Sequence, residues 1–435
     1  MSDLKLSGGK NTVFFEGEVG QIECDLPLRA WWLDWSPVDE LRLSSARFRL
    51  KSGGDEEMAG IFSQFLQERA SSLNSLTINS LDLSWGYSRL NHGSLQGTSL
   101  RATRSEEGWQ VQLRGGNFAQ NWLRGLRLEE ADLVVGEEGI KLSKARFTGG
   151  NQGELVMTGS VAGSGASPLL NLKVKMRSMP LGLLAEAAQI DLAPFIAGEL
   201  GGEFVIEGNL DRPLRAAGRL DWGGGERVIL RDAWPILKTL SVLDVDRSYR
   251  RVVFEEGGFD FSTHRGKLEV ENLRAGSQSG LLIKGGFHTR YLNQQEAAKA
   301  LQIELTKGGA GALDISSAEK LEVERFSLGA SNTREGGEDE EGDSLDLADL
   351  ESSVRQVNEA RLREEMRTPV YEGELQLGVP PQAFRKFPEL KQRYLNAESE
   401  LCWIPLTLAS RLSAVSEAEA DRLLEESRRQ EKGTK

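Results

Sequence analysis

Cysteine is scarce in this chain. Among its 435 residues there are two cysteines, Cys24 and Cys402. They stand far apart and form no Cys-x-x-Cys pair, so the sequence indicates neither a redox motif nor a cysteine-based metal site. Cys402 is followed by Trp403 and Ile404, and we interpret both cysteines as small buried hydrophobic side chains rather than as a disulfide. We expect no metal and no other cofactor.

Recognisable catalytic motifs are absent as well. The chain has no Gly-x-Ser-x-Gly, His-Glu-x-x-His or P-loop pattern. His264 and His288 flank one repeated segment, but no cysteine or carboxylate cluster accompanies them at metal-ligand spacing. Carboxylates occur throughout, so a catalytic pair in a cleft, as in a glycosidase, stays an alternative. We expect a protein that is not an enzyme.

Long hydrophobic runs and an excess of positive charge are also missing. No stretch reaches the ~18 apolar residues of a membrane-spanning helix, and the opening MSDLKLSGGKN lacks the order of a signal peptide. The net charge is −13. Phosphate binding needs a concentrated basic surface, so we expect no nucleic-acid partner.

Glycine, by contrast, is plentiful. The chain has 48 glycines but only 12 prolines, a balance that favours many tight turns. Between the turns, apolar and polar residues alternate, as in Trp109–Leu113 and Leu170–Met176. Alternation of this kind gives a strand one apolar and one polar face. The pattern predicts a mainly β protein of about fifteen strands, mostly paired with antiparallel neighbours.

An internal repeat is visible within this pattern. Residues 139–161 read GIKLSKARFTGGNQGELVMTGSV, and residues 266–287 read GKLEVENLRAGSQSGLLIKGGF. With one gap, Phe147 aligns with Leu273 and Gly159 aligns with Gly285. Each copy predicts a strand, a glycine turn and a second strand. A lone hairpin cannot bury its apolar face, so such units are expected to stack side by side into one continuous sheet.

Few helices are indicated. Pro180–Ile190 and Asp232–Leu243 have apolar residues at helical spacing, and either helix could plug or cap an end of the sheet. A shorter helix is expected near Phe62–Leu66. Ser416 and Glu419 have capping-box spacing, which predicts that a final charged helix begins at Ser416. A strand pair is expected within 397–408, interrupted by Pro405.

The character of the chain changes after residue 330. The run SNTREGGEDEEGDS is acidic and has no apolar residue, which is typical of a solvated linker. We therefore expect four regions. Residues 1–74 form N-terminal strands with a short helix and a Trp-rich end. Residues 75–330 form the repeat sheet, 331–345 the flexible linker, and 346–435 a helix, a strand pair and the terminal helix.

Three tryptophans lie close together near the start, at Trp31, Trp32 and Trp35. Such a cluster can sit at a membrane interface, where amphipathic rings are favoured. It can equally form a local core beneath the first strands. Both interpretations stay open from the sequence, and these three residues are our candidates for membrane contact.

Three longer stretches resemble the AsmA-like family of bridge-like lipid-transport proteins, relatives of TamB and YhdP. They are GELGGEFVIEGNLDRPLRAAGRLDW at 198–222, VVFEEGGFDFSTHRGKLEVENLRAGSQSGLLIKGGF at 252–287, and the segment 75–118. The resemblance implies an elongated, curved antiparallel sheet shaped like a groove, with an apolar concave face for acyl chains. It also implies phospholipid traffic that supports outer-membrane biogenesis or integrity.

The same resemblance implies a location and partners. Members of the family project into the periplasm of diderm bacteria from an N-terminal helix in the inner membrane. That anchor is absent from this chain, so the resemblance places it on the full-length gene product. Phospholipid or another acyl-chain lipid is the expected ligand, and inner or outer membrane and other envelope proteins are the expected partners.

Strand alternation assigns candidate residues to the apolar face. An apolar face of hundreds of Å² without a covering layer indicates a ligand or a partner. The alternative is a structural or adhesion protein with a filled β core and no lipid. The candidates that face the groove are Val111, Leu113, Leu142, Phe147, Leu155, Met157, Leu172, Val174, Leu268, Leu281 and Ile283.

Overall fold

The computed structural model describes most of the strand-rich part of the chain. Described residues are 4–8, 14–24, 39–50, 73–88, 91–120, 123–136, 138–150, 152–162, 169–187, 196–209, 214–231, 235–244, 247, 249–264, 267–301, 358–363, 365–366, 368–409 and 412–433. The predicted Trp cluster, the helix near Phe62–Leu66 and the acidic linker lie outside the described residues.

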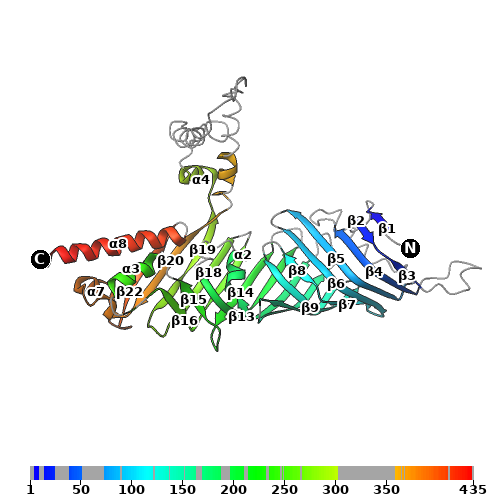
Figure 1. Ribbon diagram of the computed structural model, residues 1–435, viewed down its shortest axis with the longest axis horizontal. Coiled ribbons are helices and arrows are strands. Elements are labelled where there is room, and N and C mark those ends of the chain that lie inside the picture. Colours follow the sequence, from blue (N-terminus) through cyan, green and yellow to red (C-terminus); the bar gives the residue numbers. More distant parts are fainter. Residues whose placement is uncertain are drawn as a thin grey trace, which may run out of the picture. The chain divides into compact units, whose positions relative to one another are not determined.

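The protein is mainly β, as predicted, and its described strands are linked by pairing into one large sheet (Figure 1). The first strands are β1 (Leu4–Ser7), β2 (Phe14–Val19), β3 (Ile22–Cys24), β4 (Glu40–Leu50), β5 (Ser75–Ser88), β6 (Asn91–Ser105), β7 (Gly108–Arg114), β8 (Asn117–Gln120), β9 (Leu123–Gly136), β10 (Gly139–Gly149), β11 (Gly153–Ala162) and β12 (Leu169–Pro180). The remaining strands are β13 (Ile196–Asn209), β14 (Arg215–Trp222), β15 (Val228–Arg231), β16 (Arg251–Phe254), β17 (Glu256–His264), β18 (Lys267–Gly276), β19 (Leu282–Tyr291), β20 (Pro369–Val379), β21 (Leu395–Asn396) and β22 (Leu401–Leu408).

Strand order follows the chain closely. From β5 to β14 each strand pairs with the next, with β7 and β8 together filling one place between β6 and β9. The sheet continues through β17, β18, β19, β20 and β22. The pairings among β5–β14, from β14 through β17 and β18 to β19, and between β20 and β22 are antiparallel, whereas β4 and β5 are parallel. The short β15–β16 hairpin branches from the start of β13.

There are 22 described strands, more than the sequence predicts, partly because glycines divide long strands into two pieces. Gly115 and Gly116 separate β7 from β8, and both have positive φ angles of 70° and 103°. Positive φ is costly for residues with a Cβ, so these positions favour glycine. The two pieces pair with the same neighbours, β6 and β9.

The two copies of the sequence repeat fold as matching hairpins. One is β10–β11 and the other is β18–β19, both antiparallel. Gly159 and Gly285, which the alignment equates, have φ angles of 151° and 141°. At both sites the position of a Cβ is taken by backbone of the adjacent strand, next to Leu172 and Leu375 respectively. A side chain at either position would collide with the adjacent strand, so both positions require glycine. The repeated glycine in the sequence therefore marks a place where two strands approach closely.

Helices are few among the described elements, and all of these except α8 are short. They are α2 (Leu181–Ala187), α3 (Pro235–Leu243), α4 (Gln294–Ala300), η3 (Pro381–Phe384), α7 (Pro388–Tyr394) and α8 (Leu412–Gly433). The helices α2 and α3 lie within the two segments predicted to be helical. None of these described helices is long and apolar enough to cross a membrane.

Two details of the C-terminal region correct the predictions. Strand β22 runs through Pro405 without a break, because it is the last long strand of the sheet and an edge strand tolerates a missing N–H. Helix α8 begins at Leu412, so Ser416 lies inside it rather than at its start. The residues from Leu412 to Val415 can also form helix, so the helix starts before Ser416. The capping-box spacing of Ser416 and Glu419 therefore predicted a start that is four residues too late.

The chain divides into two compact units. The larger comprises Met1–His288 and Tyr371–Lys435, and the smaller comprises Thr289–Val370. In the smaller unit, α4 begins with a capping box between Asn293 and Glu296, and Ala297, Ala298 and Leu362 form its own buried cluster. The four regions predicted from composition stay a prediction.

Candidate functional site: an apolar sheet face

One face of the sheet in the larger unit is apolar across nearly its whole width. Residues that are partners in neighbouring strands point to the same face, so a row can be followed from strand to strand. Its central row, from β4 to β19, is Leu43, Ile78, Leu100, Leu113, Ala131, Ala145, Met157, Val174, Phe204, Gly218, Phe261, Val270 and Phe287.

A second row runs beside the first and is equally apolar. It consists of Leu41, Leu76, Ala102, Val111, Leu133, Leu142, Gly159, Leu172, Ile206 and Ala216. We call the face that carries these rows the apolar face. No position in either row is polar, as the clean alternation of an antiparallel sheet with one apolar face predicts.

The strand register puts the groove candidates that lie within strands on this apolar face, whereas Leu281 directly precedes β19 and lies outside the register. They are not equally accessible. Buried members are Phe147, Leu155, Val174, Leu281 and Ile283. Half-buried members are Val111, Leu113, Leu142, Met157, Leu172 and Leu268. The half-buried set therefore contains the positions that could contact a ligand directly. Trp31, Trp32 and Trp35 lie outside the described residues.

Aromatic side chains on this face meet across an intervening strand. The ring centroids of Phe118 (β8) and Phe147 (β10) are 4.9 Å apart, although β9 lies between them. Phe204 (β13) and Phe261 (β17) are 5.5 Å apart across Gly218 of β14. Two strand intervals span roughly 9.5 Å in a flat sheet, so the rings lean toward each other over the strand between. Sequence analysis named Phe147 but missed Phe118, Phe204 and Phe261, although the same alternation contains them.

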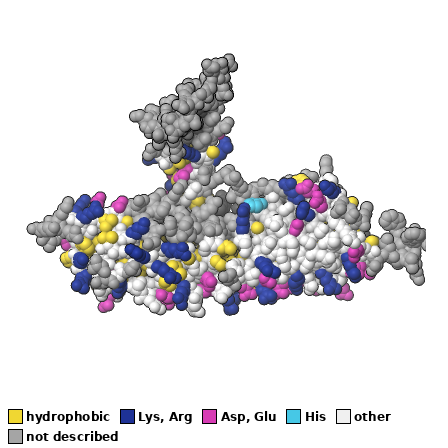
Figure 2. Space-filling model, in the orientation of Figure 1, with side chains coloured by type: hydrophobic (Ala, Val, Ile, Leu, Met, Phe, Trp, Pro, Cys, Tyr) yellow, Lys and Arg dark blue, Asp and Glu magenta, His cyan; other side chains and the backbone are white. Residues whose placement is uncertain are grey.

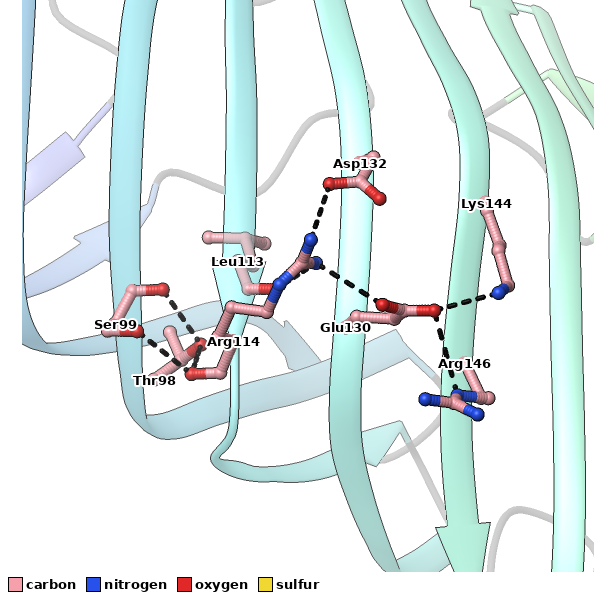
Figure 3. A network of polar contacts seen from close by, with 8 residues as sticks. All are labelled: Thr98, Ser99, Leu113, Arg114, Glu130, Asp132, Lys144 and Arg146. Atoms are coloured by element: carbon pink, nitrogen blue, oxygen red, sulfur yellow. Dashed lines mark hydrogen bonds and ion pairs between the residues drawn. The ribbon is translucent and has the colours of Figure 1, made fainter.

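The opposite face is charged, and many of its charges are paired across neighbouring strands. In Figure 3, Arg114 on β7 reaches toward Glu130 and Asp132 on β9, and Glu130 also faces Lys144 and Arg146 on β10. The Lys144 Nζ lies 2.7 Å from a Glu130 carboxylate oxygen. Its hydrogen bond holds the pKa of Glu130 below the usual value.

Similar cross-strand pairs recur along this polar face. Lys175 Nζ is 2.6 Å from Glu203 on the next strand, and Arg219 is 3.1 Å from Asp260. Figure 2 likewise shows basic and acidic side chains close together along the border of the molecule. Such a face is well solvated and offers no concentrated charge of one sign, so the distinctive surface is the apolar one.

The apolar face is closed at its C-terminal end. The apolar-facing residues of β20 and β22, from Tyr371 to Val379 and from Cys402 to Leu408, include eight side chains that are each 5% exposed or less. Helix α3 contributes three fully buried side chains, Ile236, Leu237 and Leu240, to the same hydrophobic cluster. Helix α3 also lies against α8 and η3 (Figure 1). This region has an ordinary filled core.

Helix α3 is fixed in place by buried hydrogen bonds. The Tyr249 hydroxyl donates to Asp244 at 2.7 Å, and both side chains are buried. The Ser241 hydroxyl donates to the Leu237 carbonyl and accepts from the Tyr249 N–H. Burial, together with the Asp244 carboxylate, raises the pKa of Tyr249, so the hydroxyl keeps its proton.

The described residues offer no metal centre. Among them, no three His, Cys, Asp or Glu side chains come together in a way that could hold an ion. His288 lies 3.3 Å from Glu372 on the polar side of β19 and β20. Both cysteines are free thiols: Cys402 is buried as predicted, but Cys24 is exposed, so the prediction of a buried side chain is wrong there. The chemistry that the described site can supply is apolar contact.

Comparisons with known proteins identify no relative of this chain. No protein-family model matches the chain, and no curated protein or solved structure matches it either.

Proposed function

We propose that this protein binds an acyl-chain lipid, such as a phospholipid, on its apolar face and carries it without chemical change. The observation that supports this most directly is the pair of unbroken apolar rows, whose members over β5–β12 include half-buried side chains. Each acyl CH₂ moved from water onto such a surface gains about 0.8 kcal/mol. Because the rows are uniform, this gain changes little as a chain moves along them.

Curvature of the sheet is part of the proposal. The convergence of Phe118 with Phe147, and of Phe204 with Phe261, suits a face that is concave toward the apolar side. A concave face would also shield side chains such as Leu142 and Leu172 from water without a second layer above them.

The biological setting is proposed from the AsmA-like resemblance alone. In that setting the protein works at the cell envelope of a diderm bacterium, with an inner-membrane anchor on the full-length gene product, and supports outer-membrane biogenesis. The second candidate is a structural β-repeat protein with a filled core. The closed C-terminal end, with the buried side chains Ile236, Leu237 and Leu240 of α3, favours that description for β20–β22 only.

Native mass spectrometry with lipid extraction tests the proposal. We expect the purified full chain to carry phospholipid at a defined stoichiometry. Leu172→Asp should lower this occupancy about tenfold or more, since a carboxylate is costly to place beside an acyl chain. Lys173→Asp provides the matched control, because Lys173 is the next residue of β12 and points to the polar face.

Two results would contradict the proposal. One is a monodisperse protein that is free of lipid after purification and takes none up from vesicles. The other is an equal loss of lipid in the Leu172→Asp and Lys173→Asp variants, which would show that the lipid does not bind on the apolar face. Circular dichroism of each variant verifies that the sheet is intact.

A further inference from the structure

The short β15–β16 hairpin, which branches from the start of β13, has two unlike faces. Its inner side chains are buried and belong to the same hydrophobic cluster as α3; they are Val228, Leu230, Val252 and Phe254. The outer side chains alternate with these and point away from the cluster. Because the core holds the inner side in place, the outer side is a fixed platform.

Two arginines lie directly opposite each other on this outer face. Arg231 of β15 and Arg251 of β16 are register partners, and both are exposed. Side chains that face each other in this way have Cβ atoms about 4.5–5.5 Å apart, and like charges at that separation repel. Within the part of the chain that the structure describes, neither arginine forms an ion pair. Arg250, the residue before β16, adds a third exposed cation.

The longer strands compensate many of their basic residues. Lys175, for example, lies across from Glu203 and forms an ion pair with it. Arg274 and Lys284 also face each other, but Lys284 lies over the Trp403 ring, 4.0 Å from its centroid. In Figure 2, dark blue side chains gather with little magenta among them in the part of the view where Figure 1 shows α3, β15 and β16. In a chain of net charge −13, this is a local concentration of positive charge.

The outer face of the hairpin combines this charge with apolar contact. Ile229 and Val253 are register partners beside the arginine pair, and both are half-buried. Guanidinium groups bind phosphate oxygens through two parallel N–H bonds. Phosphate next to an apolar layer is what the surface of a membrane presents. A nucleic acid lacks the apolar layer and needs a wider basic surface, so the membrane is the better fit.

We propose that the outer face of the β15–β16 hairpin docks the protein on a membrane that contains anionic phospholipid. Arg231 and Arg251 bind lipid phosphates, and Ile229 and Val253 lie at the boundary of the apolar layer. This docking site is separate from the apolar face of the sheet, and it goes beyond the proposed lipid binding. It requires a membrane surface rather than a single acyl chain, and it turns the hairpin toward that surface.

Flotation of the full chain with vesicles tests the docking site. The vesicles contain phosphatidylcholine alone or phosphatidylcholine mixed with phosphatidylglycerol, and the quantity compared is the additional binding that phosphatidylglycerol brings. Arg231→Gln/Arg251→Gln should lower the affinity for the mixed vesicles about tenfold or more, because two cations are removed near an anionic surface. Binding to phosphatidylcholine alone should not change. A parent chain without any preference for phosphatidylglycerol would overturn the proposal.

Arg215→Gln/Arg219→Gln is the matched control. It also removes two exposed arginines, but these lie on β14 and pair with Glu207 and Asp260. The change in net charge is the same, and salt screens exposed charges beyond about 8 Å, so the affinity for mixed vesicles should fall less than about twofold. An equal loss in both double variants would overturn the proposal, because the effect would then follow net charge alone.

A charge-preserving variant covers the case in which the glutamine variant is misfolded. Arg231→Lys/Arg251→Lys keeps both charges and loses only the planar forks. It should retain the preference for phosphatidylglycerol, at an affinity between those of the parent and the glutamine variant. Loss of the preference in the lysine variant, with an unchanged circular dichroism spectrum, would overturn the assignment to lipid phosphate at a membrane surface.

Competition separates the membrane from other sources of negative charge. Inorganic phosphate should release no more protein from mixed vesicles than sodium chloride of equal ionic strength. Greater release would overturn the membrane assignment in favour of a free phosphate ligand, and tighter binding to poly-glutamate than to vesicles would assign the hairpin to an acidic protein. Native mass spectrometry keeps the two proposals distinct. A parent chain that carries no lipid but prefers phosphatidylglycerol vesicles would reject the lipid function and support the docking site.

Discussion

The stretch β5–β12 and the C-terminal end β20–β22 share one sequence pattern but differ in what lies against it. Both alternate apolar and polar residues, and both direct their apolar side chains to the same face of the sheet. Over β20–β22 these side chains are buried in one cluster with side chains of α3, and α7 and α8 pack against β22. Over β5–β12 many stay half-buried, including Leu113 and Leu142. Packing partners, and not the strands themselves, decide whether such a face is a core or a binding surface.

The largest expected effect comes from truncating a side chain at the closed end. Leu237→Ala should lower the free energy of unfolding by about 2–5 kcal/mol, because it leaves a cavity in a filled core. Leu172→Ala on the open stretch should cost less than about 1.5 kcal/mol, since Leu172 is only half-buried. Urea denaturation followed by circular dichroism measures both changes.

Val242→Ala is the control for the helix itself, because Val242 lies on α3 and is 65% exposed. Its effect should be close to zero. If Leu237→Ala and Leu172→Ala prove equally destabilising, the two regions are packed alike and the comparison between them fails.

A smaller effect is expected from the buried hydrogen bond that holds α3. Tyr249→Phe keeps the ring but removes the hydroxyl that donates to Asp244. Because Asp244 is buried, the loss should destabilise the fold by about 1–3 kcal/mol. Amide hydrogen exchange should accelerate in α3 more than in β10 or β11. Lipid occupancy over β5–β12 should not change, and a marked loss there would show that the two regions are coupled.

The smallest effect is expected on the polar face, at Glu130. Its pKa is lowered, chiefly by the hydrogen bond from Lys144. A carboxylate with a depressed pKa adds stability above its unfolded pKa, and this contribution is lost as the pH falls through the folded value. Glu130→Gln should therefore be slightly less stable than the parent at pH 7, and the difference should vanish in acid, below the ordinary carboxylate range of about 4.

Added salt should shrink the same difference at pH 7, because the Glu130 pairs are near the surface and are screened. Denaturation at both pH values, with and without salt, provides the measurement. A difference that persists in acid would assign the effect to packing of Glu130 instead of its charge.

The sequence predicts the strands and their faces well, because a period of two residues is a local property. The register puts Val111, Leu142 and Leu172 in one row, as the alternation requires. Closure of the C-terminal end could only be suggested, since the side chains that share a buried cluster with Leu237 include those of distant β20, β22 and α8. Pro405 within β22 was misread for a related reason, because its tolerance depends on the strand's place at the edge.

The glycines also show that the sequence does not reveal contacts between separate strands. Gly159 and Gly285 could be aligned as a repeat, but the sequence did not show that each makes room for the backbone of the next strand. Nor did it identify the rings that meet over Gly218, since Phe204 and Phe261 are separated by the β15–β16 hairpin and α3. The missing information is spatial and comes from strands that are not neighbours in sequence.

The strand order also has a consequence for how the chain folds. From β5 to β14 each strand can join the growing sheet as soon as it is made, since its partner is the segment just before it. Contacts of low sequence separation form quickly. The β19–β20 joint is different, because the chain leaves the sheet at Tyr291 and returns only at Pro369. Closing that loop carries an added entropy cost. The closed C-terminal end of the sheet, with β20 and β22, is therefore expected to assemble last.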